Sequence, residues 1–421
     1  MTTTRPIPTL SSAALAETGA LLTARQRVVY VVVLGALTAL GPFTVDLYLP
    51  AMPSLQTELG VGTAAIQLTL AGTTLGFAVG QLLIGPLSDK VGRKGPLVFA
   101  ALLHIAACVG AAMAPDIVWL CVFRVLQGFG AAAGGVVAMA MVRDLFGGKR
   151  LVKMLSRLAL VSGLAPVLAP VIGSQLLLFT DWRGLFWSLA IYGAVVVTCV
   201  ALFIVETLPA ARRHIRGHST MRDRYRSLFS DRVFVGAIVL GGMNFTGLFA
   251  YLTTSSFLFQ DVFNFSAQQF GLLFAVNSIG VVLGVQISAR LMRSGIGPQW
   301  ILAVTTIAQL AMAVAILVLA DQHAGFWGTA IPLWFYITAC GFSFPAIQVL
   351  ALANHGAEAG TAASLLGAVN FGLAGLVAPL IGMLGVASAL PMGIVMSATA
   401  IIAITVLWTI VRPRPVPALA D

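Results

Sequence analysis

The chain has 421 residues, of which 59% are hydrophobic and only 9% are charged, with a net charge of +10. A soluble domain carries about a quarter charged residues, so the composition excludes a water-soluble enzyme or nucleic-acid-binding protein. Because a membrane crossing needs about 20 apolar residues, the long apolar runs predict an all-α integral membrane protein with roughly twelve transmembrane helices.

Short polar breaks separate the apolar runs and define the expected spans. We place these at residues 28–50, 64–86, 95–114, 117–141, 155–179, 184–205, 233–257, 268–289, 299–320, 327–350, 361–385 and 388–411. The tail of residues 1–27 has no cleavage-type apolar core, so the first span is expected to be retained rather than removed with a signal peptide. A second short tail, residues 412–421, follows the last span.

Basic residues lie almost entirely on one side of the expected membrane. Of the 24 Lys and Arg residues, all but Arg124 and Arg183 share one side: they fall in the tails and alternate loops or, for Arg157, at the adjoining start of the fifth span. This asymmetry predicts that both termini are cytoplasmic. The positive charge therefore indicates topology and contact with anionic membrane lipid, and no nucleic-acid partner is expected.

The two halves of the chain show traces of an internal repeat. A basic break at residues 206–232 separates six spans in residues 28–205 from six spans in residues 233–411. The segment APVIG at 169–173 returns as APLIG at 378–382, and the segment that starts at Gly80 has a weaker echo 200 residues later. This pattern predicts two six-helix bundles related by a pseudo-two-fold axis, with a central site between them.

Asp46 is an acid near the outer end of the first span, within the stretch TVDLYLP. An acid at the centre of a membrane costs about 2.5 to 3.5 kcal/mol on insertion scales and usually faces a cavity or a partner. We interpret Asp46 as a proton-binding group. An interfacial acid or a structural ion pair is the alternative interpretation.

Arg124 is the only basic residue inside an expected span other than Arg157, which is the third residue of the fifth span, and it falls in the same half of the membrane as Asp46. It could hold a polar or anionic group, or tune the protonation of Asp46; the alternative is an arginine that extends outward to the headgroups. Gln127 shares its helix face. We assign Asp46 and Arg124 to proton coupling, and Asp46, Tyr48 and Gln127 to the substrate cavity.

The later spans add weaker candidates. Asn244 and Tyr251 are seven residues apart on one face of the seventh span and are further candidates for substrate contact. His104 and the four cysteines are interpreted as packing residues. No metal-binding motif, phosphate-binding loop or nucleophile motif occurs, so we expect no cofactor and no enzymatic activity.

Two motifs indicate segments that could move during a conformational change. The break SDKVGRKG between spans two and three carries an acid that topology marking does not require, which favours a gating loop formed by Gly85, Asp89, Gly92, Arg93 and Lys94. Pro166 and Pro170 remove two hydrogen-bond donors from span five, upstream of Gly173, and predict a bend or pivot; a passive packing kink is the alternative.

These motifs resemble those of the major facilitator superfamily. GPLSDKVGRK is similar to the loop between its second and third helices, and FRVLQGFGAA to its fourth-helix motif, whose arginine is here Arg124. TVDLYLPAMP and the proline-containing fifth span resemble the twelve-span drug:proton antiporters of the Bcr/CflA, or bicyclomycin-resistance, type. Ser174 stands where a second glycine is common in the fifth-helix motif.

The resemblance implies a multi-pass protein of a bacterial-type inner membrane that exports small amphipathic drugs by alternating access. A proton gradient would supply the energy, with Asp46 changing protonation, and the chain is expected to work as a monomer. A proton-linked carrier of a metabolite, such as a sugar or an amino-acid derivative, is the nearest alternative. A membrane-embedded enzyme or receptor is a more distant one, because the sequence shows neither a catalytic cluster nor a sensing domain.

Overall fold

The computed structural model describes residues 23–208, 221–355, 359–386 and 388–414. Within this part of the chain, twelve helical segments are long and apolar enough to cross a membrane, as the apolar runs predict. Several begin at an aspartate that accepts hydrogen bonds from the first free backbone N–H groups of its helix: Asp116, Asp181 and Asp231.

The first half contains α2 (Ala24–Asp46), η1 (Leu49–Ala51), α3 (Met52–Leu59), α4 (Thr63–Val91), α5 (Lys94–Ala112), α6 (Ile117–Leu145), α7 (Gly148–Leu176) and α8 (Trp182–Phe203). The second half contains α10 (Met221–Ser230), α11 (Arg232–Phe257), η2 (Leu258–Val262), α12 (Ala267–Arg293), α13 (Pro298–Asp321), α14 (Gly325–Leu352), α15 (Ala359–Leu384), α16 (Leu390–Val406) and η4 (Leu407–Val411). The described residues form helices and loops, with no strand.

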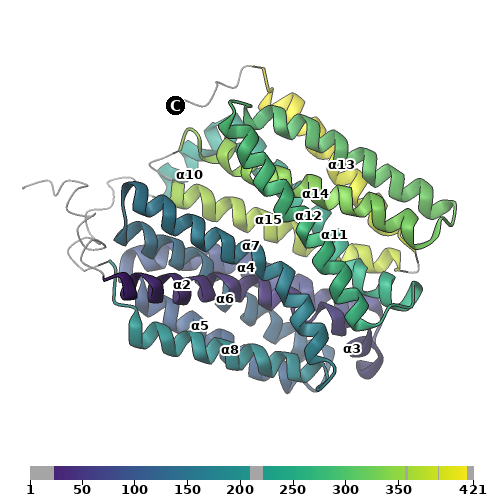
Figure 1. The fold of residues 1–421 in the computed structure, drawn as a ribbon, viewed down its shortest axis with the longest axis horizontal. Coiled ribbons are helices and arrows are strands. Elements are labelled where there is room, and N and C mark those ends of the chain that lie inside the picture. Colours follow the sequence, from purple (N-terminus) through teal and green to yellow (C-terminus); the bar gives the residue numbers. More distant parts are fainter. Residues whose placement is uncertain (1–22, 209–220, 356–358, 387, 415–421) are drawn as a thin grey trace, which may run out of the picture.

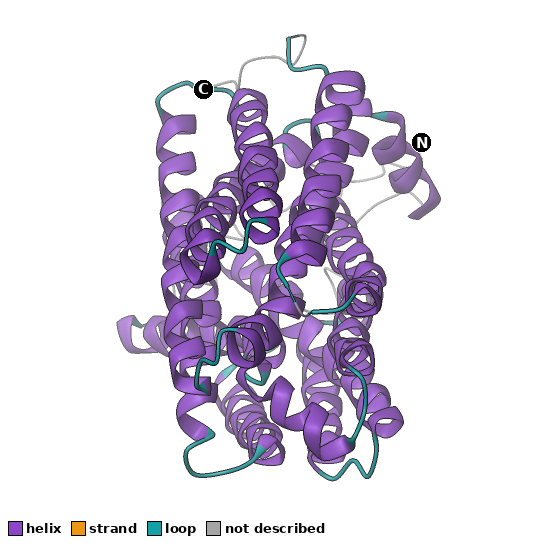
Figure 2. Cartoon of the chain, turned by 90° about the vertical axis from the view of Figure 1, so that its right-hand side faces the viewer, coloured by secondary structure: helices purple, strands orange, loops and turns teal. Residues whose placement is uncertain are grey.

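The two halves lie side by side as two helical bundles (Figure 1; Figure 2). In the view of Figure 1, α2 and α4 to α8 form the lower bundle, and α11 to α16 form the upper one. The start of α2 and the end of η4 lie at the same end of the molecule, which we call the terminal end. The other end is called the distal end. The bundles meet mainly where α4 packs along α15 and α7 along α12.

Glycines on the second helix of each half support the expected repeat. A side chain at Gly76 of α4 would overlap the carbonyl oxygen of Val125 in α6. A side chain at Gly284 of α12 would likewise overlap the carbonyl oxygen of Thr338 in α14. In both halves, therefore, the missing side chain lets the second and fourth helices pack backbone to backbone.

Several segments differ from the sequence expectation; α7, for example, begins at Gly148 rather than at residue 155. The first span was expected to continue to residue 50, but α2 ends at Asp46 and a 3₁₀ turn follows, because Pro50 and Pro53 cannot donate backbone hydrogen bonds to a continuing helix. The second helix extends five residues beyond the expected end, to Val91. Helix α10 lies within the expected loop of residues 206–232, of which residues 209–220 are outside the described part.

Candidate substrate and proton site

Asp46 is the last residue of α2, and only 5% of its surface is exposed. Among the described residues, no hydrogen bond or ion pair reaches its carboxylate. Its carboxylate lies close enough to Tyr251, which belongs to α11 in the other half, for the two groups to interact electrostatically. Asp46 therefore lies where the end of α2 faces the second bundle.

Arg124 contacts the opposite side of the same α2 terminus. Its Nη1 donates to the carbonyl oxygen of Thr44 at 2.9 Å, and its guanidinium lies 4.1 Å from the ring centre of Tyr48. Thr44 and Tyr48 are each two residues from Asp46, which is about 200° around a helix. Arg124 thus holds the back of the segment that carries Asp46 and forms no ion pair with it.

The guanidinium of Arg124 is fully buried and only partly bonded. Nη1 also donates to Oε1 of Gln127 at 2.6 Å, while Nε and Nη2 have no hydrogen-bond partner. The hydroxyl of Tyr48 pairs with Thr69 of α4 at 3.1 Å. Tyr48 and Gln127, both predicted to line the cavity, therefore support Arg124 inside the first bundle.

His104 and Cys108 on α5 extend this network, although sequence reasoning did not join them to Arg124. Nδ1 of His104 lies 3.1 Å from the backbone oxygen of Gln127, and its Nε2 lies 3.3 Å from Sγ of Cys108. The amide of Gln127 donates to the same sulfur at 3.0 Å. The sequence signal that could have joined these two residues is their spacing: they are four residues apart and so share one face of a helix.

The two candidates on α11 have different surroundings. The hydroxyl of Tyr251 accepts a hydrogen bond from Asn277 of α12 at 3.1 Å, and its ring stacks on Phe274. Asn244 instead accepts from Gln309 of α13 at 2.6 Å, within the second bundle. The seven-residue spacing placed both on one helix face, but the structure does not bring them together, because α11 contacts different helices along its length.

Helix α7 approaches the backbone directly after Asp46. A side chain at Gly173 would overlap the carbonyl oxygen of Leu47, so only glycine permits this contact. Pro166 and Pro170 lie inside α7, which remains one helix from Gly148 to Leu176. Ser174 turns its carbonyl oxygen toward Gln268 of α12, which donates to it at 2.9 Å.

Hydrogen bonds join the two halves at the distal end, beyond Asp46. Gln67 of α4 donates to the carbonyl oxygen of Thr253 at 3.0 Å, and Ser256 donates to that of Leu49 at 2.6 Å. Gln260 donates to the carbonyl oxygen of Pro50 at 3.1 Å. We call this set, with the bond between Gln268 and Ser174, the distal latch; it joins the two halves between Asp46 and that end.

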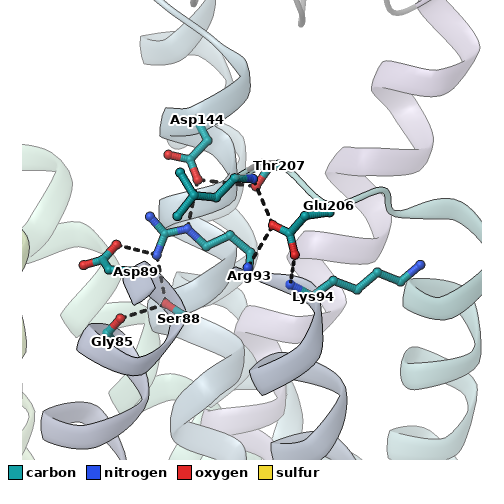
Figure 3. Close-up of polar contacts among 9 residues, drawn as sticks. Gly85, Ser88, Asp89, Arg93, Lys94, Asp144, Glu206 and Thr207 are labelled. Atoms are coloured by element: carbon teal, nitrogen blue, oxygen red, sulfur yellow. Dashed lines mark hydrogen bonds and ion pairs between the residues drawn. The ribbon is translucent and has the colours of Figure 1, made fainter. Parts of the chain in front are cut away.

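The predicted gating loop lies at the terminal end. Arg93 is buried between two acids: its Nη1 is 2.7 Å from Asp89, and its Nε is 2.9 Å from Asp144 at the end of α6 (Figure 3). Gly92 has a φ of 106°, which favours glycine and ends α4 before Arg93. Gly85 faces Ser364 of α15 across the contact between the halves.

A second acid, Glu206, holds the start of α5. Its carboxylate accepts the backbone N–H groups of Arg93 and Lys94 at 2.8 and 3.0 Å, and Thr207 donates to Asp144 at 3.3 Å (Figure 3). The ammonium of Lys94 donates to the carbonyl oxygen of Ala201 in α8. Sequence reasoning missed Asp144, Glu206 and Thr207, because acids just beyond a span look like ordinary loop residues.

Sequence comparison finds similarity over nearly the whole chain. A model of the Major Facilitator Superfamily matches residues 34–379. An uncharacterised MFS-type transporter, YdgK, of Bacillus subtilis is 33% identical over 93% of this chain and 98% of its own length. A bicyclomycin resistance protein homolog of Haemophilus influenzae is 27% identical over 89% and 94% of the two chains, and the multidrug resistance protein MdtL of Escherichia coli is 28% identical over 79% and 83%.

Solved structures show the same fold at low identity. A partially occluded, inward-open form of the xylose transporter XylE from Escherichia coli gives a TM-score of 0.73 at 14% identity, covering 94% of this chain and 99% of that one. The human organic anion transporter MFSD10 gives 0.61 at 18% identity, covering 92% and 100%. Together with the family match over residues 34–379, this means that the chain belongs to the Major Facilitator Superfamily, whose members are secondary active transporters rather than enzymes.

Proposed function

We propose that this protein exports small amphipathic compounds, antibiotics among them, in exchange for protons. The observation that carries the proposal is Asp46: a buried carboxylate between the two bundles with no ion-pair partner among the described residues. Such a group can take up either a proton or a cationic or polar substrate without first breaking an ion pair. Competition between the two is the simplest basis for exchange.

Alternating access needs a barrier on each side of the site in turn. In this conformation the hydrogen bonds of the distal latch are formed, and Asp46 precedes by three residues Leu49, whose carbonyl oxygen accepts the bond from Ser256. In our proposal the latch opens when Asp46 exchanges its ligand, and the terminal end then closes around the loop of Asp89 and Arg93. Arg124 contacts Thr44 and Tyr48 and so positions the end of α2, which in turn positions the carboxylate of Asp46.

The relatives' names support export over uptake. Two of them are called a bicyclomycin resistance protein homolog and a multidrug resistance protein, and both align over most of their length. The bias of basic residues supports cytoplasmic termini, so in our proposal the distal latch lies on the outer side of a bacterial inner membrane. A single chain contains both bundles and the site between them, so the proposed working unit is a monomer.

The test is proton release from the purified protein in weakly buffered detergent as candidate antibiotics are added. Wild-type protein is expected to release protons on binding, and Asp46→Asn is expected to bind without release. Asp321→Asn, which changes an exposed aspartate at the end of α13, is the matched control and should behave as wild type.

Two other results would change the assignment. Release that persists in Asp46→Asn would move the proton site to another residue and refute the role given to Asp46. Release caused by sugars or amino-acid derivatives, with none caused by antibiotics, would make the protein a proton-linked metabolite carrier.

A further inference from the structure

An apolar groove runs along the side of the second bundle, on the face turned away from the first bundle and from Asp46. It has a volume of about 770 Å³ and lies between α13 and α14, with one end at the last turn of α12. Its walls on α13 extend from Trp300 to Ala315, which is about 22 Å of helix at 1.5 Å per residue. The groove is therefore long and narrow and parallel to the helices.

Small side chains create the groove, and its polar groups are already bonded. Ala308, Ala315 and Ala339 leave the space between α13 and α14 that larger residues would fill. Thr305 in its wall pairs with Ser343 at 2.9 Å, and Thr338 donates to the carbonyl oxygen of Trp334 at 2.7 Å. With these hydroxyls satisfied, the lining suits hydrocarbon and offers little to a polar ligand.

The terminal end of the groove carries positive charge. Leu291 and Ile296 line that end, and Arg290 and Arg293 lie in the last turn of α12 beside them. Val276, Ile279, Leu283 and Ile287 form an exposed apolar stripe on α12, and Arg290 continues it three residues later. Trp300, 43% exposed, lies at the same level, where aromatic rings meet lipid headgroups.

We propose that this groove is a binding site for an anionic phospholipid, with one acyl chain along α13 and α14 and the phosphate near Arg290 and Arg293. An acyl chain has the shape that the groove requires. The groove is about 22 Å long, which is more than the roughly 15 Å of hydrocarbon in one leaflet, so an extended acyl chain fits along it. Because basic residues lie at only one end of the groove, they determine at which end the lipid phosphate binds. This site is separate from the proposed transport site.

A lipid, rather than a transported compound, fits the position of the groove. It opens to the bilayer, and its charged end lies at the terminal end, where the basic loops gather. A compact drug would use neither the full length nor the two arginines. Binding here would hold α12, α13 and α14 together at the periphery of the second bundle.

The experiment measures retention of phosphatidylglycerol and phosphatidylcholine by the full-length protein in detergent, using native mass spectrometry. Ala308→Trp fills the middle of the groove, and Ala315→Met is a milder blockage in case the first variant does not fold. Arg290→Gln removes charge at the mouth. Ala194→Trp on the exposed face of α8 and Arg150→Gln at the start of α7 are matched controls.

Wild type and both controls should retain phosphatidylglycerol in preference to phosphatidylcholine. The groove-filling variants should lose several-fold of that retention, and Arg290→Gln should weaken phosphatidylglycerol about fivefold, the effect of one basic residue at an anionic surface, with phosphatidylcholine unchanged. Wild-type retention by both folded groove variants, or equal loss of the two lipids in Arg290→Gln, would overturn the proposal.

Discussion

Arg124 places a positive charge inside the membrane without a carboxylate to balance it among the described residues. Its partners are a backbone carbonyl, a glutamine amide and the ring of Tyr48, and two of its nitrogens have none. A buried charge that is incompletely paired costs free energy. Stability alone therefore does not explain this arginine, which supports a role in transport.

A comparison with Arg93 tests this interpretation. Arg93→Met would leave the buried Asp144 without its guanidinium partner, so a loss of about 3–5 kcal/mol in the free energy of unfolding is expected. Arg124→Met strands no carboxylate and should cost about 1–3 kcal/mol, the loss of its hydrogen bonds, while abolishing proton-coupled transport. Thermal unfolding in detergent and transport in vesicles measure the two effects, and equal destabilisation would mark Arg124 as a structural residue.

At the scale of elements, the contact between α7 and the end of α2 depends on Gly173. Gly173→Ala would force its new methyl group into the carbonyl oxygen of Leu47, so the two helices must separate. We expect a loss of about 1–3 kcal/mol in stability, as for other overpacked cores, and reduced transport because Asp46 is displaced.

Helix α7 offers its own control for that prediction. Gly163 lies in the same helix, and a side chain there would meet no atom within 4 Å. Gly163→Ala should therefore leave transport unchanged and keep or slightly raise the melting temperature, because alanine favours helix. If the two variants behave alike in thermal unfolding, the close contact of Gly173 has no energetic importance.

The start of α11 is fixed by Asp231, which lies before the membrane span. Burial raises the pKa of this carboxyl, but the N–H of Val233, Asn354 and His355 bond to it, and together they hold its pKa below the ordinary value. A carboxylate with a lowered pKa stabilises the fold above the pKa of the unfolded chain, and that stabilisation is lost as the pH falls through the folded pKa.

The melting temperature of Asp231→Asn should accordingly fall below that of wild type at pH 7. As the pH is lowered below about 4, the ordinary aspartate pKa, the difference between the two proteins should shrink. Thermal unfolding at a series of pH values measures this, with the exposed Asp321→Asn as reference. A difference that grows on acidification would contradict the role of the charged Asp231.

At the scale of the whole molecule, the distal latch is the group of contacts that we propose holds the distal end closed. Gln67→Ala combined with Ser256→Ala removes two hydrogen bonds between the halves, worth about 2 kcal/mol together, or close to thirtyfold in the equilibrium between closed and open. The combined variant should therefore populate a conformation open at the distal end.

Spin labels at Gly62 and Asn264, on opposite halves at that end, report the change after the four native cysteines are replaced. The distance distribution should gain a longer component in the latch variant and remain as in wild type for Gln322→Ala, a change of an exposed glutamine after α13. An unchanged distribution in the latch variant would show that apolar packing, rather than these hydrogen bonds, holds the end closed.

The sequence was most informative about residues whose cost in a membrane is high wherever they lie. Asp46 and Arg124 stood out because charge inside an apolar run is expensive; Asp46 is the last residue of α2, and Arg124 of α6 contacts that helix end. Their relation was not predictable: they contact opposite sides of that helix end, since α2 stops at Asp46 and turns. The seven-residue spacing did not predict the surroundings of Asn244 and Tyr251 for a similar reason: the neighbouring helices decide what each part of a helix face contacts.

The number of spans and the division into halves were determined by the sequence alone, because a bilayer forces each crossing to be a long apolar helix. Helix contacts inside the bundle are made by small apolar and neutral polar groups, which have no such signature. Only the tertiary structure could therefore decide that Glu206 holds the start of α5, that Ser256 bonds to Leu49 across the two halves, and that alanines leave an apolar groove between α13 and α14.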